Sequence, residues 1–128
     1  MIPLCRAEGL GLIPWSPLAR GLLARKLQTE TVRAKTDDFA KSLYSKTAES
    51  DGKVIERVQT LATAYGVPPA RIALAWLLHK PGVTAPIVGA SKPQHLEDAI
   101  GALSLKLTAE EIASLEAPYV PHAVAGHE

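Results

Sequence analysis

The stretch IPWSPLARG, residues 13–21, indicates a parallel α/β fold, because a polar loop directly follows a short apolar run. Residues 10–15 are almost continuously apolar, as expected of a strand that is buried on both faces of a parallel sheet. Pro14 lacks the N–H that an interior ladder position needs, so we expect the strand to end there.

A second stretch, PIVGASKPQHLED at residues 86–98, repeats this arrangement. Residues 83–88 form another short apolar run, which breaks at Gly89. Pro93 suits the first turn of a helix that we expect to reach Ile100. Ligands of α/β folds bind at the carboxyl ends of parallel strands, so both junctions are candidate ligand sites.

The sequence around these stretches predicts helices. Over residues 53–65, apolar residues recur at helical spacing and place one stripe toward a core: Val54, Val58, Leu61, Ala62 and Tyr65. Gly66 is expected to end this helix, and residues 70–79 predict a second, buried one. Thr108 and Glu111 have the spacing of a capping box at the start of the last helix.

The predicted order of elements contains only two strands, separated by helices. Two strands cannot form a stable parallel sheet with both faces covered. We therefore expect residues 1–128 to be a single partial domain of a larger fold. Within it, residues 25–50 have weak periodicity and predict a long surface loop, and residues 118–128 predict a C-terminal tail.

Composition excludes several classes of function. Apolar residues make up 47% of the chain, which predicts a globular core, and the net charge of +1 gives no reason to expect nucleic acid or an anionic membrane as partner. No apolar run approaches the roughly 20 residues that span a bilayer, and the first residues lack the pattern of a secretion signal. One cysteine excludes an internal disulfide and fits a reducing compartment, so we expect a cytoplasmic protein.

The residues at both junctions suit an anionic ligand. Ser16 can donate a hydrogen bond, amides over residues 18–21 could surround a phosphate, and Gly21 permits an unusual backbone conformation or a close approach. Ser91 and the following helix start offer further donors, and Lys92 adds a positive charge. From the residues alone, an ordinary loop and a serine that only caps a helix remain open.

The two stretches, their spacing and the helical sequence ALAWL at residues 73–77 resemble the aldo-keto reductases. The resemblance is to the branch that includes bacterial reductases and potassium-channel β subunits, and it covers nearly the whole chain. Residues 13–21 resemble the seventh-strand loop of that family, and residues 89–98 resemble its eighth-strand cofactor segment. The resemblance implies the C-terminal portion of a (β/α)₈ TIM barrel, with NADP(H) bound and aldehydes or ketones reduced by hydride transfer.

The resemblance also implies which residues contact the cofactor. They fall into two groups: Trp15, Ser16, Pro17, Leu18 and Arg20 in the first loop, and Gly89, Ser91, Lys92, His95 and Asp98 in the second. In the family, an aromatic residue at the place of Trp15 stacks on nicotinamide, and the rest of the first loop wraps the pyrophosphate. Ser91 and Lys92 fall where the family meets the 2′-phosphate. His95 stands where Arg or Gln is more frequent, and Asp98 stands where Glu is common.

No residue of this chain is predicted to be catalytic. The family's Asp, Tyr, Lys and His tetrad lies on N-terminal strands that the resemblance does not reach, and its tyrosine is the general acid. Tyr44, Tyr65 and Tyr119 match no such position. His122 and His127 lack the further ligands that a metal site needs, so no metal is expected.

Three functional hypotheses follow. The first is a fragment of an NADP(H)-dependent oxidoreductase, whose intact form would take a small carbonyl substrate. The second is a non-catalytic nucleotide-binding or interaction module, and the third is a fragment without independent function. Open strand edges and apolar helix faces also predict self-association or pairing with the N-terminal half of a barrel.

Overall fold

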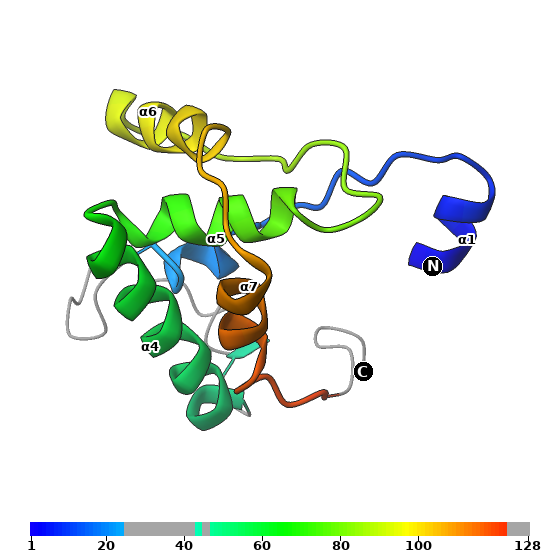
Figure 1. The fold of residues 1–128 in the computed structure, drawn as a ribbon. Coiled ribbons are helices and arrows are strands. Elements are labelled where there is room, and N and C mark those ends of the chain that lie inside the picture. The colour runs from blue at the N-terminus through cyan, green and yellow to red at the C-terminus, as the bar shows by residue number, and fades with distance from the viewer. Residues whose placement is uncertain (25–42, 45–46, 123–128) are drawn as a thin grey trace.

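The computed structural model describes residues 1–24, 43–44 and 47–122 of the chain. Helices dominate it (Figure 1), and in chain order they are α1 (Ile2–Ala7), the 3₁₀ helix η1 (Ala19–Gly21), α4 (Ala48–Tyr65), α5 (Pro69–Leu78), α6 (Pro93–Ala102) and α7 (Ala109–Glu116). The predicted helices are therefore present. Most of the predicted loop over residues 25–50 and the end of the predicted tail lie outside the described residues.

Helix α4 begins at Ala48, earlier than the predicted start at Lys53, so the last residues assigned to the 25–50 loop are helical. The first turn carries Glu49 and Asp51, whose negative charges suit the positive end of the helix dipole. Thr47 adds a hydrogen bond from its hydroxyl to the Asp51 carboxylate. These polar contacts extend the helix beyond its apolar stripe, which was the basis of the predicted boundary.

The two predicted strands pair in parallel, but through isolated bridges. Leu12 pairs with Val83, and Trp15 pairs with Ile87. Trp15 lies three residues after Leu12, whereas Ile87 lies four residues after Val83. The second segment therefore has one extra residue between the two bridges, and the register shifts by one. The predicted parallel βαβ connection is confirmed, whereas continuous strands are absent from the described part of the chain.

Prolines explain why the pairing is interrupted. The Leu12 amide donates to the Gly82 carbonyl at 3.1 Å, the Thr84 amide to the Leu12 carbonyl at 2.8 Å, and the Ile87 amide to the Pro14 carbonyl at 2.9 Å. Pro14 and Pro86 have no N–H to continue this ladder. The paired segments consequently stay short.

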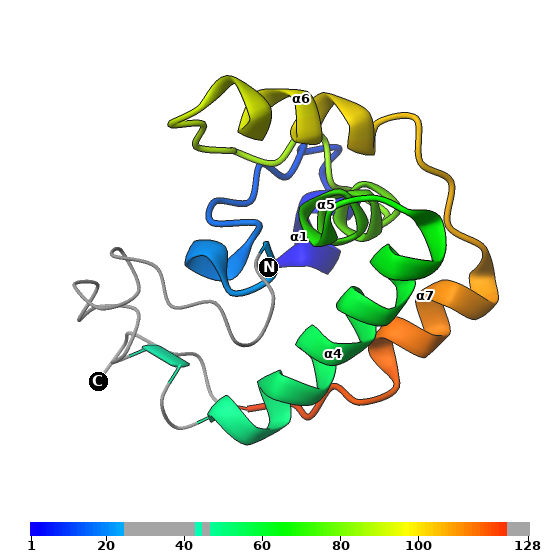
Figure 2. The same ribbon diagram turned by 90° about the vertical axis from the view of Figure 1, so that its left-hand side faces the viewer.

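The core lies where α5 packs against α4 and α7 approaches α4 (Figure 2). Its buried members come from these helices and the segment before α7: Val58, Ala62, Ile72, Ala73, Ala75, Leu107 and Leu115. Ile72 is completely buried, and the neighbouring residues through Ala75 of α5 are buried as well. A helix with consecutive buried residues is a central element, as its continuous apolar sequence predicts.

Tyr65 does not belong to this core, contrary to its predicted place in the apolar stripe of α4. Its side chain is 38% exposed, and its hydroxyl donates to a carboxylate oxygen of Glu111 at 2.9 Å. The same Glu111 oxygen accepts the Thr108 amide, and the Thr108 hydroxyl accepts the Glu111 amide, so the predicted capping box is confirmed. A phenol hydroxyl needs such a polar partner, which draws the ring to the surface. The hydrogen bond to the carboxylate raises the pKa of Tyr65 above its ordinary value.

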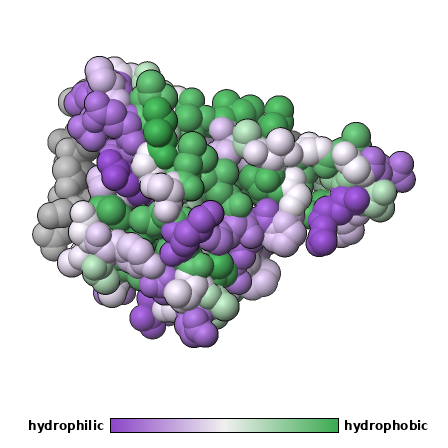
Figure 3. Space-filling model, turned by 45° about the horizontal axis from the view of Figure 1, so that its top comes forward, coloured by the Kyte–Doolittle hydropathy of each residue, from purple (hydrophilic) through white to green (hydrophobic). Residues whose placement is uncertain are grey.

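Large apolar side chains remain exposed on the face that carries α6 and the bridged segments (Figure 3). They include Leu96, Ile100 and Leu103 of the α6 region, and Ile13, Trp15 and Ile87 at the bridges. The side chains of Leu96, Ile100 and Leu103 are 52%, 58% and 64% exposed. A face of this kind is typical of a surface that another part of a protein covers.

Within the described ranges, no single helix is long and apolar enough to cross a membrane. Helices α4 and α5, which meet at an angle of 104°, satisfy that length and composition test only as a bent pair.

Candidate cofactor site

The two predicted ligand loops begin side by side. The bridge between Trp15 and Ile87 is parallel, so the chain leaves both residues in the same direction. Residues 16–21 follow the first partner, and residues 88–92 follow the second. The structure therefore brings the beginnings of the two predicted groups together at one edge.

The first loop has an unusual backbone. Ser16, Ala19 and Arg20 have left-handed φ angles of 50°, 48° and 54°, and they are the non-glycine residues with positive φ in the described part of the chain. Such conformations cost on the order of 1–3 kcal/mol each and gather at functional sites. This strain is not predictable from the residue types, because none of the three is a glycine.

Turn hydrogen bonds hold this loop. The Ala19 amide donates to the Ser16 carbonyl at 2.9 Å, and the Gly21 amide donates to the Leu18 carbonyl at 2.9 Å. Two of the four amides in the predicted phosphate cradle at residues 18–21 are thus used within the turn itself. Gly21 has a φ of 96°, and a methyl group in place of its hydrogen would meet no atom within 4 Å. Glycine is therefore required here for its backbone conformation rather than for a close approach.

The predicted contacts of the first loop differ in exposure, and Leu18 also packs against the hydrophobic core. The Trp15 side chain is 67% exposed, and Ser16, Pro17, Leu18 and Arg20 are half-buried. Ser16 is the hydroxyl donor among them. Their roles as cofactor contacts stay predictions.

The second loop presents an open helix start. Lys92 is the N-cap of α6, its backbone is extended, and no side chain caps the helix there. Ser91 therefore does not act as the helix cap, which was the alternative explanation for it. The Ser91 hydroxyl oxygen lies 3.5 Å from Nδ1 of His95. Four of the predicted contacts of this loop are exposed: Gly89, Ser91, Lys92 and His95. An uncapped helix N-terminus beside a lysine favours an anion.

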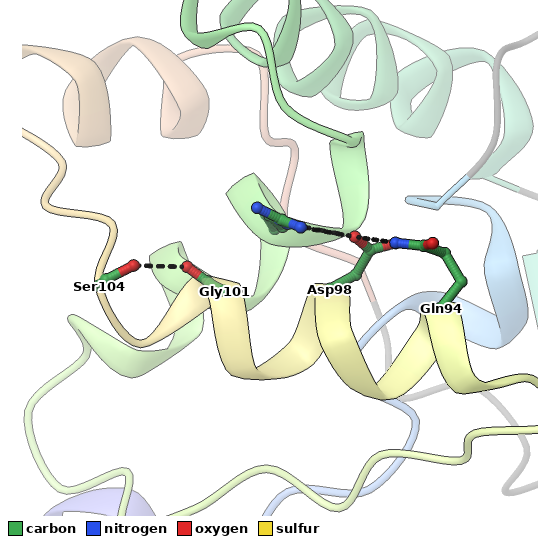
Figure 4. A network of polar contacts seen from close by, with 5 residues as sticks. Gln94, Asp98, Gly101 and Ser104 are labelled. Carbon is green, nitrogen blue, oxygen red and sulfur yellow. Dashed lines mark hydrogen bonds and ion pairs between the residues drawn. The ribbon is translucent and has the colours of Figure 1, made fainter.

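Asp98 occupies a different environment from the other predicted contacts. Its Oδ1 atom accepts a hydrogen bond from Nε of Arg71 at 3.2 Å and another from Nε2 of Gln94 at 3.4 Å. Figure 4 shows Asp98 and Gln94 directed toward one another on α6. Only 13% of the Asp98 side chain is exposed. The structure thus places Asp98 at the contact between α5 and α6, and a direct contact with cofactor stays a prediction.

Arg71 was not predictable as a functional residue from the sequence. It lies 27 residues before Asp98 in a helix that was singled out only for its apolar residues. Helical periodicity shows which residues share one helix face, but it does not show which charges meet across two helices.

The side chains around these loops give no indication of a metal. Over residues 1–24, 43–44 and 47–122, no three His, Cys, Asp or Glu side chains could hold an ion together. His127, one of the two tail histidines considered above, lies outside the described residues.

Comparison with known proteins gives the family. The sequence profile of the Aldo/keto reductase family matches residues 1–119. The chain is 47% identical over 128 residues to a Schizosaccharomyces pombe protein that carries the name putative aryl-alcohol dehydrogenase, covering 98% of this chain and 35% of that protein. It is 44% identical over 126 residues to versiconal hemiacetal acetate reductase of Aspergillus parasiticus, covering 97% of this chain and 36% of the relative. This chain therefore belongs to the aldo/keto reductase family.

The likeness to solved structures concerns the fold. All of this chain superposes on 40% of a glycerol dehydrogenase from Gluconobacter oxydans, with a TM-score of 0.68 and 21% sequence identity. The described helices and parallel bridges are therefore part of an incomplete (β/α)₈ barrel, as predicted. The chain spans about a third of the length of the curated relatives named above. Members of this family in general use a nicotinamide cofactor.

Proposed function

We propose that this chain supplies the C-terminal half-site for NADP(H) in an oxidoreductase that reduces aldehydes or ketones. The observation that carries the proposal is the parallel bridge between Trp15 and Ile87, which starts two donor-rich loops at one edge of the fold. When bound, the nicotinamide group supplies the hydride for the carbonyl carbon. The residues of this chain bind and orient the cofactor.

The first loop suits the pyrophosphate end of such a ligand. Ser16 provides a hydroxyl donor, and its left-handed backbone turns the chain sharply after Trp15. The amide of Leu18 belongs to the predicted cradle and is not used by the turn bonds described above. In this proposal Trp15, which is largely exposed, offers its ring face to the nicotinamide.

The second loop suits the 2′-phosphate, which distinguishes NADP(H) from NAD(H). Lys92 and Ser91 lie at the uncapped N-terminus of α6, where positive charge and the first amides of the helix attract an anion. His95 lies one turn further along, with its ring near the Ser91 hydroxyl. These donors support the proposal that the 2′-phosphate binds here.

We further propose that the acid–base groups and most of the carbonyl pocket come from residues outside these 128. Further barrel strands would pair with the short bridged segments and cover the apolar face of α6. We also propose a small carbonyl substrate, pairing with those strands, and a cytoplasmic location. The last one rests on the single cysteine.

The direct test compares NADPH and NADH binding to the chain by nicotinamide fluorescence. Lys92→Ala should weaken NADPH binding by at least about tenfold, because a hydrogen bond to a charged group contributes roughly 1.5–3 kcal/mol. It should leave NADH binding unchanged. The matched control is Lys53→Ala, at an exposed position of α4. A folded chain that binds neither nucleotide would reject an independent half-site, and equal losses for both nucleotides would reject 2′-phosphate recognition at Lys92.

A further inference from the structure

Arg71, in the first turn of α5, contacts α6 through one carboxylate oxygen. Its Nε atom donates to Oδ1 of Asp98 at 3.2 Å, and its Nη2 atom lies 3.1 Å from the same oxygen. Gln94, one turn earlier on α6, donates to this oxygen as well. The side chain of Asp98 is therefore fixed from both helices.

The Arg71 guanidinium also lies against the backbone of α6 at Gly101. A Cβ atom at Gly101 would lie 2.7 Å from Cζ and 2.8 Å from Nε of Arg71, which is closer than such atoms approach without displacement. Gly101 follows Asp98 by three residues and so lies on the same face of the helix. Arg71 thus lies against α6 at two places about one turn apart, at Asp98 and at Gly101.

Helix α6 packs along α5 within the described residues, and the Arg71–Asp98 pair lies in that contact. Ala102 is its one buried residue there, and its large apolar side chains face outward. The Arg71 and Asp98 side chains are 29% and 13% exposed, so the pair is partly sheltered from water. Partial shelter strengthens the attraction between the charges relative to a fully solvated pair.

We propose that Arg71 is a positioning residue for the 2′-phosphate end of the cofactor site. Through Asp98 and Gly101 it sets the orientation of α6, and thereby the place of Ser91 and Lys92 at the start of that helix. Asp98 then acts by binding Arg71 rather than by touching the cofactor. This inference rests on the proposed function for its ligand, but the orientation of α6 can be measured without one.

The first experiment is amide hydrogen exchange on the ligand-free chain. Arg71→Met should raise exchange across α6 by about tenfold, as expected when a coupling between two packed elements is removed. Exchange in α4 and α7 should not change. The control is Arg57→Met, the same substitution at an exposed position of α4. Unchanged exchange in α6 would overturn the inference, whatever the chain binds.

The second experiment measures the ratio of NADPH to NADH affinity. Arg71→Met should lower this ratio by roughly threefold to tenfold. In a chain that already carries Lys92→Ala, adding Arg71→Met should not lower the ratio further. Arg71→Lys should restore part of the ratio. Gly101→Ala retains both charges but places a methyl group in the space of the guanidinium, so it should lower the ratio in the same direction and by less than Arg71→Met.

The outcomes separate the two proposals. A wild-type chain that prefers NADPH, with a ratio insensitive to Arg71→Met and Gly101→Ala, would overturn only the positioning role. A wild-type chain that binds no nucleotide would contradict the proposed function, and the exchange experiment would still decide whether Arg71 fixes α6. Equal loss of both nucleotides in Arg71→Met would show a general structural role and would also overturn the inference.

Discussion

Replacing Ile72 with alanine should remove a large part of the stability of the chain. Ile72 is completely buried in the core formed by α4, α5 and the α7 region. The substitution deletes three carbon atoms, worth about 0.8 kcal/mol each in transfer from water, and leaves a cavity that adds to the loss. We expect the free energy of unfolding to fall by about 3–4 kcal/mol, against about 5–15 kcal/mol for a typical domain.

The matched control is Ile100→Ala on α6, because the same atoms are deleted from a side chain that is 58% exposed. We expect it to lower the free energy of unfolding by less than about 1 kcal/mol. Both values are measured by urea denaturation followed by circular dichroism. A loss below about 1 kcal/mol for Ile72→Ala would refute the assigned core. A loss at Ile100 as large as that at Ile72 would show that the α6 face is covered in solution.

Three further changes test local features. Thr108→Ala should lower the free energy of unfolding by about 1 kcal/mol, because it removes the capping box. The control, Thr63→Ala on the exposed side of α4, should have a much smaller effect in the same denaturation assay. Gly52→Ala should stabilise the chain by up to about 1 kcal/mol, since a methyl group there meets no atom within 4 Å, and a lower thermal midpoint would contradict this. Hydrogen bonds from Lys80 and Trp76 lower the pKa of Glu116 below its ordinary value of 4.5. These bonds therefore stabilise the fold above pH 4.5, and the stabilisation is lost as the pH falls through the lowered pKa. Glu116→Gln should flatten this acid limb of a stability profile measured from about pH 6 downward, and an unchanged profile would exclude Glu116 as its source.

Local sequence patterns predicted most of the helices. Gly66 adopts a left-handed conformation at the end of α4, and Thr108 and Glu111 form the capping box that their spacing indicates. These features depend on interactions within a few residues, so a single sequence contains them. The parallel pairing of the two apolar runs also followed from their separation by helices.

Contacts between distant residues were not predictable in this way. Tyr65 fits the apolar stripe of α4, yet its hydroxyl binds Glu111, 46 residues away. The pair of Arg71 and Asp98 joins two helices whose relative rotation no periodicity gives. Helix α4 starts at Ala48, before its predicted start, because its first turn is polar and lies outside the apolar stripe.

The candidate site was predictable in place but not in detail. The carboxyl ends of parallel strands located both loops, because that rule depends only on topology. The left-handed backbone of Ser16 and Ala19 could not be foreseen, since neither residue type favours it. The assignment of Asp98 as a cofactor contact followed from family resemblance, and the structure shows a second use for the same carboxylate.

The most direct test of the account is an NMR titration of the isotope-labelled chain with NADP⁺, with amide shifts followed residue by residue. We expect the amides of residues 15–21 other than Pro17, and those of residues 89–95 other than Pro93, to shift together with one dissociation constant. The reason is that both loops start at the same edge and, in the proposed site, bind one ligand. Shifts confined to one loop, different constants for the two, or shifts centred on the α4–α7 contact would contradict a shared cofactor site.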